Sequence, residues 1–303
     1  MGVLTPALTG MQVLNSQQAS GIRWIFCAEK GNATVNGALL SLVTSGVVGS
    51  KVAIVCGAAA DTPAAAVTAV ATSRSDRVVY TFNHPLVFFP EANGGAGAVL
   101  TVFPTSFAAA TIASLAPGVN PAGVNGSDFL GGIAGLTFNS LTINDYENFR
   151  AQGIMALEFS AERQVYSWRS GITSSLTPAL KNVARRSIAD YLENSIAAFL
   201  VNFQNKPYTQ DNQLQIQHAI QDFLDRTIRD GLLPDKATVN AFKKASDPVL
   251  LPYLVDILSG NSAATAAQGI FVVILRVRTL ASMDFIVLRT EIGESVSIVE
   301  QAA

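Results

Sequence analysis

The sequence predicts a mixed α/β (α+β) fold, and a few segments carry this prediction. Residues 51–56 form a short, continuous apolar run, which is typical of a strand buried on both faces of a parallel sheet. An alanine-rich helix over 64–71 and a second strand over 77–82 follow, so these three segments form a β-α-β unit. Farther along, apolar residues recur at helical spacing over 183–203 and 209–230, which predicts two long amphipathic helices.

Residues with capping and helix-breaking properties set the ends of the predicted helices. Asp61 or Thr62 can cap the first helix, with Pro63 at its first position. Thr209 caps the second long helix, and Gly231 ends it.

Shorter elements complete the prediction. Asn144 or Asp145 caps a helix that runs to residue 152 and closes at Gly153. The other predicted elements are helices over 106–115 and 235–245, a glycine-rich loop over 120–135, and strands over 22–28, 97–103, 154–159, 164–168, 269–280, 284–292 and 296–299.

These elements divide the chain into four parts. Residues 1–20 show no sustained period and are expected to form an extended N-terminal arm. We expect an α/β lobe over 21–143, a second lobe over 144–292, and a C-terminal arm over 293–303. No internal repeat of fixed period is visible in the sequence.

The composition is apolar for a soluble protein. Hydrophobic residues make up 49% of the chain and charged residues 14%, whereas a typical soluble domain has about 25% charged residues. One interpretation is a large apolar core. The other is extensive burial of the surface between subunits, as in obligate assemblies. Both interpretations stay open at this point.

The charge pattern does not favour a nucleic-acid or membrane partner. The net charge is −2 and the pI is 5.7, and the groups of Lys and Arg are too small to follow a phosphate backbone. The most apolar segment, residues 38–60, is interrupted by Ser, Thr and Gly and has Lys51 near its middle. Core strands are therefore expected there rather than a membrane span. Cys27 and Cys56 each lie in an apolar run, which favours two buried thiols over a disulfide.

Residues that could carry out chemistry are few. Only two histidines occur: His218 is expected on the solvated face of its helix, and His84 in a turn after a strand, without a nucleophile motif beside it. Neither cysteine has a second metal ligand at short spacing. The glycine-rich segment 93–97 lacks the third glycine of a G-x-G-x-x-G motif, and residues 46–51 lack the order of a P-loop.

Asp222 and Asp225 fall on adjacent turns of one helix face together with Arg226 and Arg229, which indicates an exposed face rather than an acid/base pair. We therefore expect no catalytic, cofactor-binding or metal site, and a function in assembly or binding. The alternative is a nucleotide- or small-molecule-binding α/β enzyme built on residues 51–82, which a fold alone cannot establish.

A series of short motifs resembles, in its order, the contractile phage-tail sheath family. Residues 117–123 (Pro-Gly-Val-Asn-Pro-Ala-Gly) resemble a loop of that family, and residues 171–175 (Gly-Ile-Thr-Ser-Ser) resemble one of its turns. The other segments that resemble the family are 141–149, 153–157, 185–192, 276–280, 284–288 and 293–300. The chain departs from the family by its short length, and by Met155 where an Asn is common.

This resemblance implies a compact sheath core domain with extended N- and C-terminal arms and little or no room for outer domains. It implies hexamers stacked around a tail tube, with baseplate and tail-terminator proteins as further partners. Terminal arms would add strands to the sheets of neighbouring subunits, and contraction would drive the tube through a host envelope. The protein would lie in the tail sheath of a virion assembled in the host cytoplasm, with no cofactor, no nucleic-acid partner and no membrane insertion.

A short apolar strand near the C-terminus is the first candidate for contacts in such an assembly. It consists of Val296, Ser297, Ile298 and Val299. An isolated strand of this kind is suited to addition at the edge of a neighbouring sheet. The alternative is that it pairs within its own chain.

A pair of lysines, Lys243 and Lys244, is the second candidate. They end the helix predicted over 235–245, and we expect them to contribute to a weak, electrostatic contact with the tube. The alternative is that they complement the helix dipole in its last turn.

Overall fold

The computed structural model describes residues 23–26, 31–44, 51–58, 60–89, 99–103, 109–123, 133–161, 164–178, 181–241, 243–244 and 246–279. The predicted arms over 1–20 and 293–303 lie outside these ranges, as do Cys27 and the predicted strands over 284–292 and 296–299.

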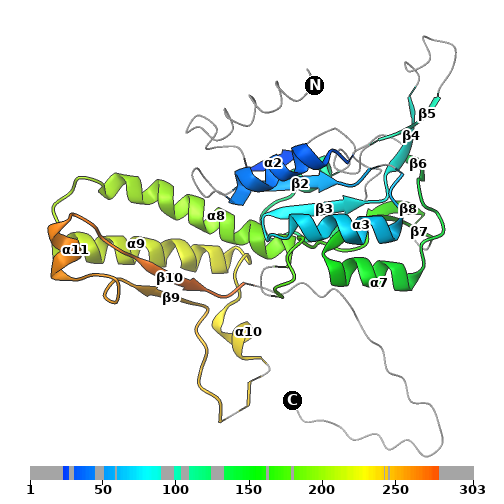
Figure 1. Ribbon diagram of the computed structural model, residues 1–303. Helices are drawn as coiled ribbons and strands as arrows, with labels where there is room; N and C mark the ends of the chain where they lie inside the picture. The colour runs from blue at the N-terminus through cyan, green and yellow to red at the C-terminus, as the bar shows by residue number, and fades with distance from the viewer. Residues whose placement is uncertain are drawn as a thin grey trace, which may run out of the picture.

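A five-stranded mixed sheet forms the centre of one half of the molecule (Figure 1). In sheet order its strands are β1 (Trp24–Phe26), β2 (Val52–Cys56), β3 (Val78–Phe82), β7 (Ile154–Ser160) and β8 (Val165–Trp168). The first four strands run parallel, and β8 pairs antiparallel with β7. The predicted α/β class is confirmed.

Three helices cover one face of this sheet: α2 (Ala33–Thr44), α3 (Pro63–Val70) and α7 (Ile143–Gln152) (Figure 1). Every residue of β2 is buried. Ala53 and Val55 pack towards these helices, whereas Val52 and Ile54 belong to a second core that also contains Trp168. Burial on both faces explains why this strand is a continuous apolar run. The predicted β-α-β unit of β2, α3 and β3 is confirmed.

A smaller antiparallel sheet lies at the outer end of this half, with strand order β5-β4-β6. Its strands are β4 (Pro85–Phe89), β5 (Val99–Val102) and β6 (Ile133–Leu136). Two short 3₁₀ turns, η2 (Ala71–Ser73) and η4 (Pro121–Gly123), and the short helix α5 (Ala110–Ala113) connect the elements of this half.

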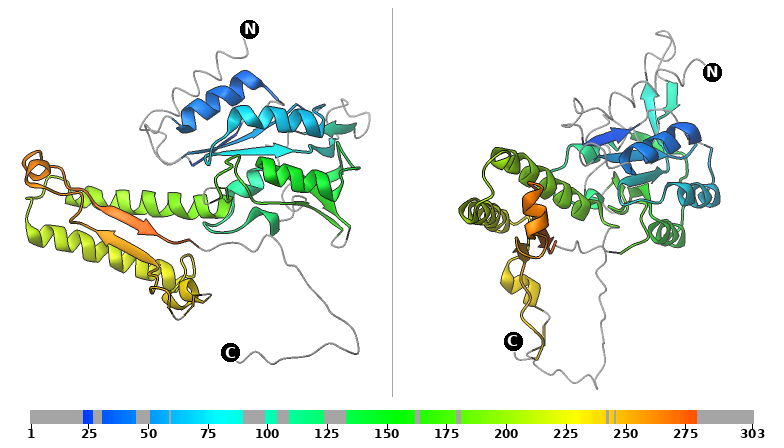
Figure 2. Two further views of the ribbon diagram at one scale, coloured as in Figure 1. Left: turned by 60° about the horizontal axis from the view of Figure 1, so that its bottom comes forward. Right: turned by 60° about the vertical axis from the view of Figure 1, so that its left-hand side comes forward.

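The other half of the molecule is a helical hairpin. Helix α8 (Val183–Leu200) leads through η5 (Val201–Phe203) into α9 (Gln210–Arg229), and the two helices run side by side away from the sheet (Figures 1 and 2). Both predicted amphipathic helices are confirmed. Apolar residues of α8 and α9, including Leu192, Ile220 and Leu224, form a third core.

A two-stranded antiparallel ribbon packs on this hairpin. It consists of β9 (Tyr253–Asp256) and β10 (Ile274–Val277), with α11 (Ala263–Ala267) between the two strands in the sequence. The short helix α10 (Lys236–Asn240) lies on a projection below α9 (Figure 1). None of the helices in the described ranges combines the length and apolar character that crossing a bilayer requires.

The structure shows which residues cap α3 and α7. Thr62 caps α3, because its hydroxyl accepts a hydrogen bond from the Ala65 amide at 3.2 Å, while Asp61 accepts one from Ala58. Neither Asn144 nor Asp145 caps α7. The cap is Thr142, and Asp145 completes a capping box by accepting from the Thr142 amide at 2.8 Å.

Other predicted elements differ in extent. Residues 33–44 form helix α2, so the strands expected from residue 38 onward begin only at β2. The predicted helix over 235–245 ends at Asn240, and the strand expected over 269–280 is confined to β10. The predicted loop over 120–135 contains η4 and the start of β6.

The five-stranded sheet takes strands from both sides of the proposed boundary at residue 143, because β7 and β8 follow β3 in sheet order. The two lobes proposed from the sequence therefore share this sheet.

Candidate functional site

The ribbon of β9 and β10 presents one apolar face to α9 and one face to the outside. Val255 is buried, and the Tyr253 hydroxyl donates a hydrogen bond to Asp225 of α9 at 2.7 Å. Burial and this hydrogen bond raise the pKa of Tyr253 to about 12. On the outer face, Leu254 lies opposite Arg276 in the register, and both are exposed.

The ribbon contains only two strands among the described residues, so each has one edge that no other described strand covers. Such edges accept added strands through backbone hydrogen bonds. Large apolar side chains in β9 and in the segments next to the two strands in sequence have exposed fractions of 42 to 77%: Val249, Leu251, Leu254, Leu258 and Ile270. Apolar side chains exposed beside a strand edge suit contact with a protein partner.

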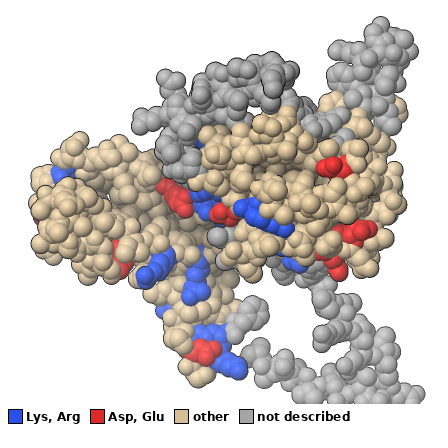
Figure 3. Space-filling model, viewed as in Figure 1, with Lys and Arg blue, Asp and Glu red and all other residues tan. Residues whose placement is uncertain are grey.

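The loop after α10 carries the two candidate lysines. The Asn240 side chain donates to the Leu250 carbonyl and accepts from the Leu250 amide, both at 2.9 Å, and so closes the base of this loop. Lys243 is half-buried and Lys244 is exposed. Figure 3 shows basic and acidic side chains together on this projection.

Since α10 ends at Asn240, both lysines lie beyond its last turn. Their predicted position within a helix is therefore wrong. Val296, Ser297, Ile298 and Val299 lie outside the described residues, so the predicted exchange strand stays a prediction.

The charged face of α9 lines a hollow of about 670 Å³, formed by Asp222, Asp225, Arg226 and Arg229. All four are exposed, as expected from the sequence. His218, on the same helix, is also exposed. This face carries charges of both signs, so it suits polar contacts rather than an acid/base pair.

His84 is buried at the junction of β3 and β4, and its Nε2 atom lies 3.1 Å from the Gly57 carbonyl oxygen. The preceding Asn83 has a φ of 71° and donates to the carbonyls of Phe138 and Leu157. These contacts link the junction of β3 and β4 to β7 and to the segments that follow β2 and β6. Among the described residues, no three His, Cys, Asp or Glu side chains lie together in an arrangement that could hold a metal ion.

A cluster of ion pairs joins the two halves of the molecule at Asp190 of α8. This carboxylate has no exposed surface and lies 2.7 Å from Arg186, 3.3 Å from Arg77 and 3.9 Å from Arg23. Burial raises the pKa of Asp190, and the neighbouring Arg186 and Arg77 oppose that effect. This cluster was not predicted from the sequence. Its one local signal is the spacing of four residues between Arg186 and Asp190.

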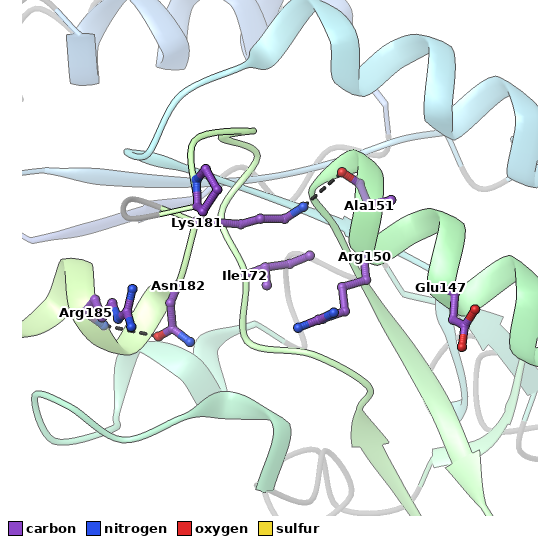
Figure 4. A pocket seen from close by; sticks show the side chains of 8 residues that line it. Glu147, Arg150, Ala151, Ile172, Lys181, Asn182 and Arg185 are labelled. Atoms are coloured by element: carbon purple, nitrogen blue, oxygen red, sulfur yellow. Dashed lines mark hydrogen bonds between the residues drawn. The ribbon is translucent and has the colours of Figure 1, made fainter. Parts of the chain in front are cut away.

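A second, basic hollow of about 280 Å³ lies between α7 and the beginning of α8 (Figure 4). Arg150 comes from α7, and Lys181 and Arg185 from the segment that starts α8. Lys181 donates to the Ala151 carbonyl at 2.9 Å. Burial, together with the charges of Arg150 and Arg74, lowers the pKa of Lys181. In Figure 4, Glu147 points away from the other labelled charges.

No protein-family model and no curated protein matches this sequence. Solved structures do match it. The anti-feeding prophage (AFP) helical sheath in the contracted state is 17% identical, with 90% of this chain and 70% of that chain covered and a TM-score of 0.66. The PVC sheath complex of an extracellular contractile injection system, also contracted, is 17% identical, with 88% and 70% covered and a TM-score of 0.67.

A chain of the AFP baseplate is 18% identical, with 86% of this chain covered and a TM-score of 0.65. This chain spans 64% of the length of that baseplate chain, so it is shorter than its structural neighbours. The resemblance expected from the short motifs is confirmed for the fold. The chain has the fold of contractile sheath proteins.

Proposed function

We propose that this chain is a structural, non-enzymatic subunit of a contractile sheath. The observation that carries the proposal is the match in fold over 86–90% of the chain to proteins of sheath and baseplate assemblies. In this proposal, hexamers of the chain stack in a helical array around a tail tube. Contraction of the array then drives the tube through a host envelope.

The surface of the ribbon supports a role in assembly. The edges of β9 and β10 that no described strand covers, with the exposed apolar side chains beside them, suit an added strand better than they suit water. Residues 296–299 of a neighbouring copy are the proposed source of such a strand. This use of the ribbon would also account for a chain with only 14% charged residues.

The loop that carries Lys243 and Lys244 is the proposed contact with the tube. It projects from the helical hairpin (Figure 1), and Lys244 is exposed. Exposed ion pairs contribute only about 0–1 kcal/mol each, which suits a contact that must be released when the sheath contracts. Baseplate and tail-terminator proteins are further proposed partners, in a virion tail assembled in the host cytoplasm.

Electron microscopy of the purified chain, alone and with its tube protein, tests this proposal. We expect rings, or cylinders with sixfold symmetry. A chain that stays monomeric at high concentration and in the presence of the tube would contradict the proposal. A small, uniform oligomer that binds a nucleotide would instead support an α/β enzyme.

A further inference from the structure

The basic hollow between α7 and α8 has the chemistry of a site for carboxylates. Arg150, Lys181 and Arg185 place three positive charges around about 280 Å³, and Glu147 is the one acidic residue among the described residues that line it. The first turn of α8 contains no acidic residue, although the positive end of a helix dipole favours one. Arginine binds carboxylates through two parallel hydrogen bonds, and lysine binds them as a point charge.

The chain carries a complementary segment at its C-terminus. Residues 280–303 contain four acidic residues, Asp284, Glu291, Glu294 and Glu300, against one arginine, Arg289, which gives a net charge of −3. Because the whole chain has a net charge of −2, residues 1–279 carry +1, from 19 basic and 18 acidic residues. The excess negative charge of the protein therefore lies entirely in this terminal segment.

We infer that the basic hollow binds a carboxylate from residues 280–303 of a second copy of this chain. The inference rests on the proposed assembly, which brings copies together, and it adds a charged anchor to the strand exchange proposed there. The ribbon would bind the backbone of the segment, and the hollow would bind one of its acidic side chains. A free oxyanion such as phosphate has similar chemistry and is the competing ligand.

Zero-length cross-linking of the full chain tests this inference. Carbodiimide joins the Lys181 amine to a carboxylate only when the two are in direct contact. Copies with and without ¹⁵N are mixed, assembled and cross-linked, and the linked peptides are identified by mass spectrometry. We expect a link between Lys181 of a labelled copy and an acidic residue in 280–303 of an unlabelled copy, and the reverse. A parallel sample in phosphate, at equal ionic strength, measures competition by the free anion.

Variants make the test specific. Lys181→Arg keeps the charge and should abolish the link without affecting assembly, whereas Lys206→Arg, on the hairpin, should leave the link unchanged. Arg185→Glu should raise the critical concentration for assembly about tenfold, because it places a like charge against the segment. Changing the linked acidic residue to Lys should restore assembly of this variant.

The outcomes separate this inference from the proposed function. If cylinders form without the link, or if links form only between peptides that carry the same isotope, the inference is overturned. The proposed function would still stand. Loss of the link in phosphate, with assembly unchanged, assigns the hollow to a free anion and also overturns it. If neither cylinders nor links form, the proposed function fails together with the inference.

Discussion

Arg77, one residue before β3, lies 3.3 Å from the carboxylate of Asp190 on α8, and the Asp190 side chain is completely buried. Arg186 lies 2.7 Å from the same carboxylate and also pairs with Asp76 at 3.1 Å. Ion pairs of Asp190 and Asp76 thus connect the strand side of the molecule to the helical hairpin. Breaking a buried ion pair by removing one partner is costly, because the remaining charges stay buried without compensation.

Replacement of Asp190 by Ala should therefore lower the free energy of unfolding by about 3 kcal/mol, as measured by urea denaturation. Glu193→Ala is the matched control, since Glu193 pairs with the same Arg186 and Arg77 but is 56% exposed. For an exposed pair the loss should be about 0–1 kcal/mol. Equal losses in the two variants would show that Asp190 does not hold the junction together.

The capping box of α7 gives a second prediction. Thr142→Ala removes the hydroxyl that accepts from the Asp145 amide at 3.2 Å, and with it one side of the box. The expected loss of unfolding free energy is about 1 kcal/mol. Asn144→Ala, at an exposed position two residues along, should change little. Thermal denaturation of both variants distinguishes the observed cap from the one that the sequence indicated.

Gly153 and Gly231 provide a matched pair of helix-ending glycines, because both have a φ of 76°. A Cβ at Gly153 would lie 2.9 Å from the backbone of Ser174, whereas a Cβ at Gly231 would meet nothing within 4 Å. Gly231→Ala should lower the unfolding free energy by about 1 kcal/mol, the cost of the left-handed conformation.

Gly153→Ala should cost about 3 kcal/mol, because overpacking adds to the same backbone cost. Circular dichroism during thermal unfolding measures both variants. If the two losses are similar, the Ser174 backbone moves aside easily, and the close packing of this turn is not a constraint on the fold.

Elements with a regular apolar pattern in the sequence were predicted, and elements without one were missed. The strand β2 and the helices α8 and α9 carry long, regular apolar patterns, and all were predicted. Helix α2 was missed because its buried face consists only of Val35, Leu39 and Val43, among small residues that also suit strands. The four-residue strand β9 lacks a regular alternation and was missed for a similar reason.

The candidate site was less predictable than the fold, because its contacts join distant parts of the chain. Arg77 and Asp190 are 113 residues apart, and no local pattern indicates that they meet. Arg150 and Arg185 likewise come from different helices. Lys243 and Lys244 were predicted from the sequence as tube contacts within a helix. The helix ends at Asn240, before both of them.

Asp256, at the end of β9, gives a prediction about pH. Hydrogen bonds from the Ser259 hydroxyl, the Ser259 amide and the Leu258 amide lower its pKa to about 2. An aspartate in an unfolded chain titrates near about 3.9. The contribution of ionised Asp256 to stability is therefore complete above a pH of about 3.9 and is lost as the pH falls through about 2.

An NMR titration of the side-chain carboxyl carbon should place the midpoint for Asp256 near 2. Ser259→Ala removes the largest cause and should move the midpoint upward. Asp235, whose pKa is lowered by its own contacts with Thr238, should not move in this variant and serves as the internal control. An unchanged midpoint for Asp256 would mean that the Ser259 hydroxyl does not bind the carboxylate in solution.

The proposed tube contact gives the last prediction. Changing both Lys243 and Lys244 to Glu should weaken binding of the tube while polymerisation of the chain persists, because neither lysine belongs to β9 or β10. Each exposed ion pair contributes about 0–1 kcal/mol, so the double variant should bind the tube about fivefold more weakly per subunit. This effect multiplies along a cylinder. Binding by the unchanged chain should also weaken with added salt, since charges are screened over about 8 Å at 0.15 M.

Lys236→Glu makes the same kind of charge change at an exposed position in α10, on the same projection. Co-sedimentation with the tube protein, measured beside self-assembly, compares the variants. Reduced tube binding in the double variant alone supports a specific contact at the loop after Asn240. Equal reduction by Lys236→Glu would indicate only a general attraction to an acidic tube, and unchanged binding in both would place the tube contact elsewhere on the chain.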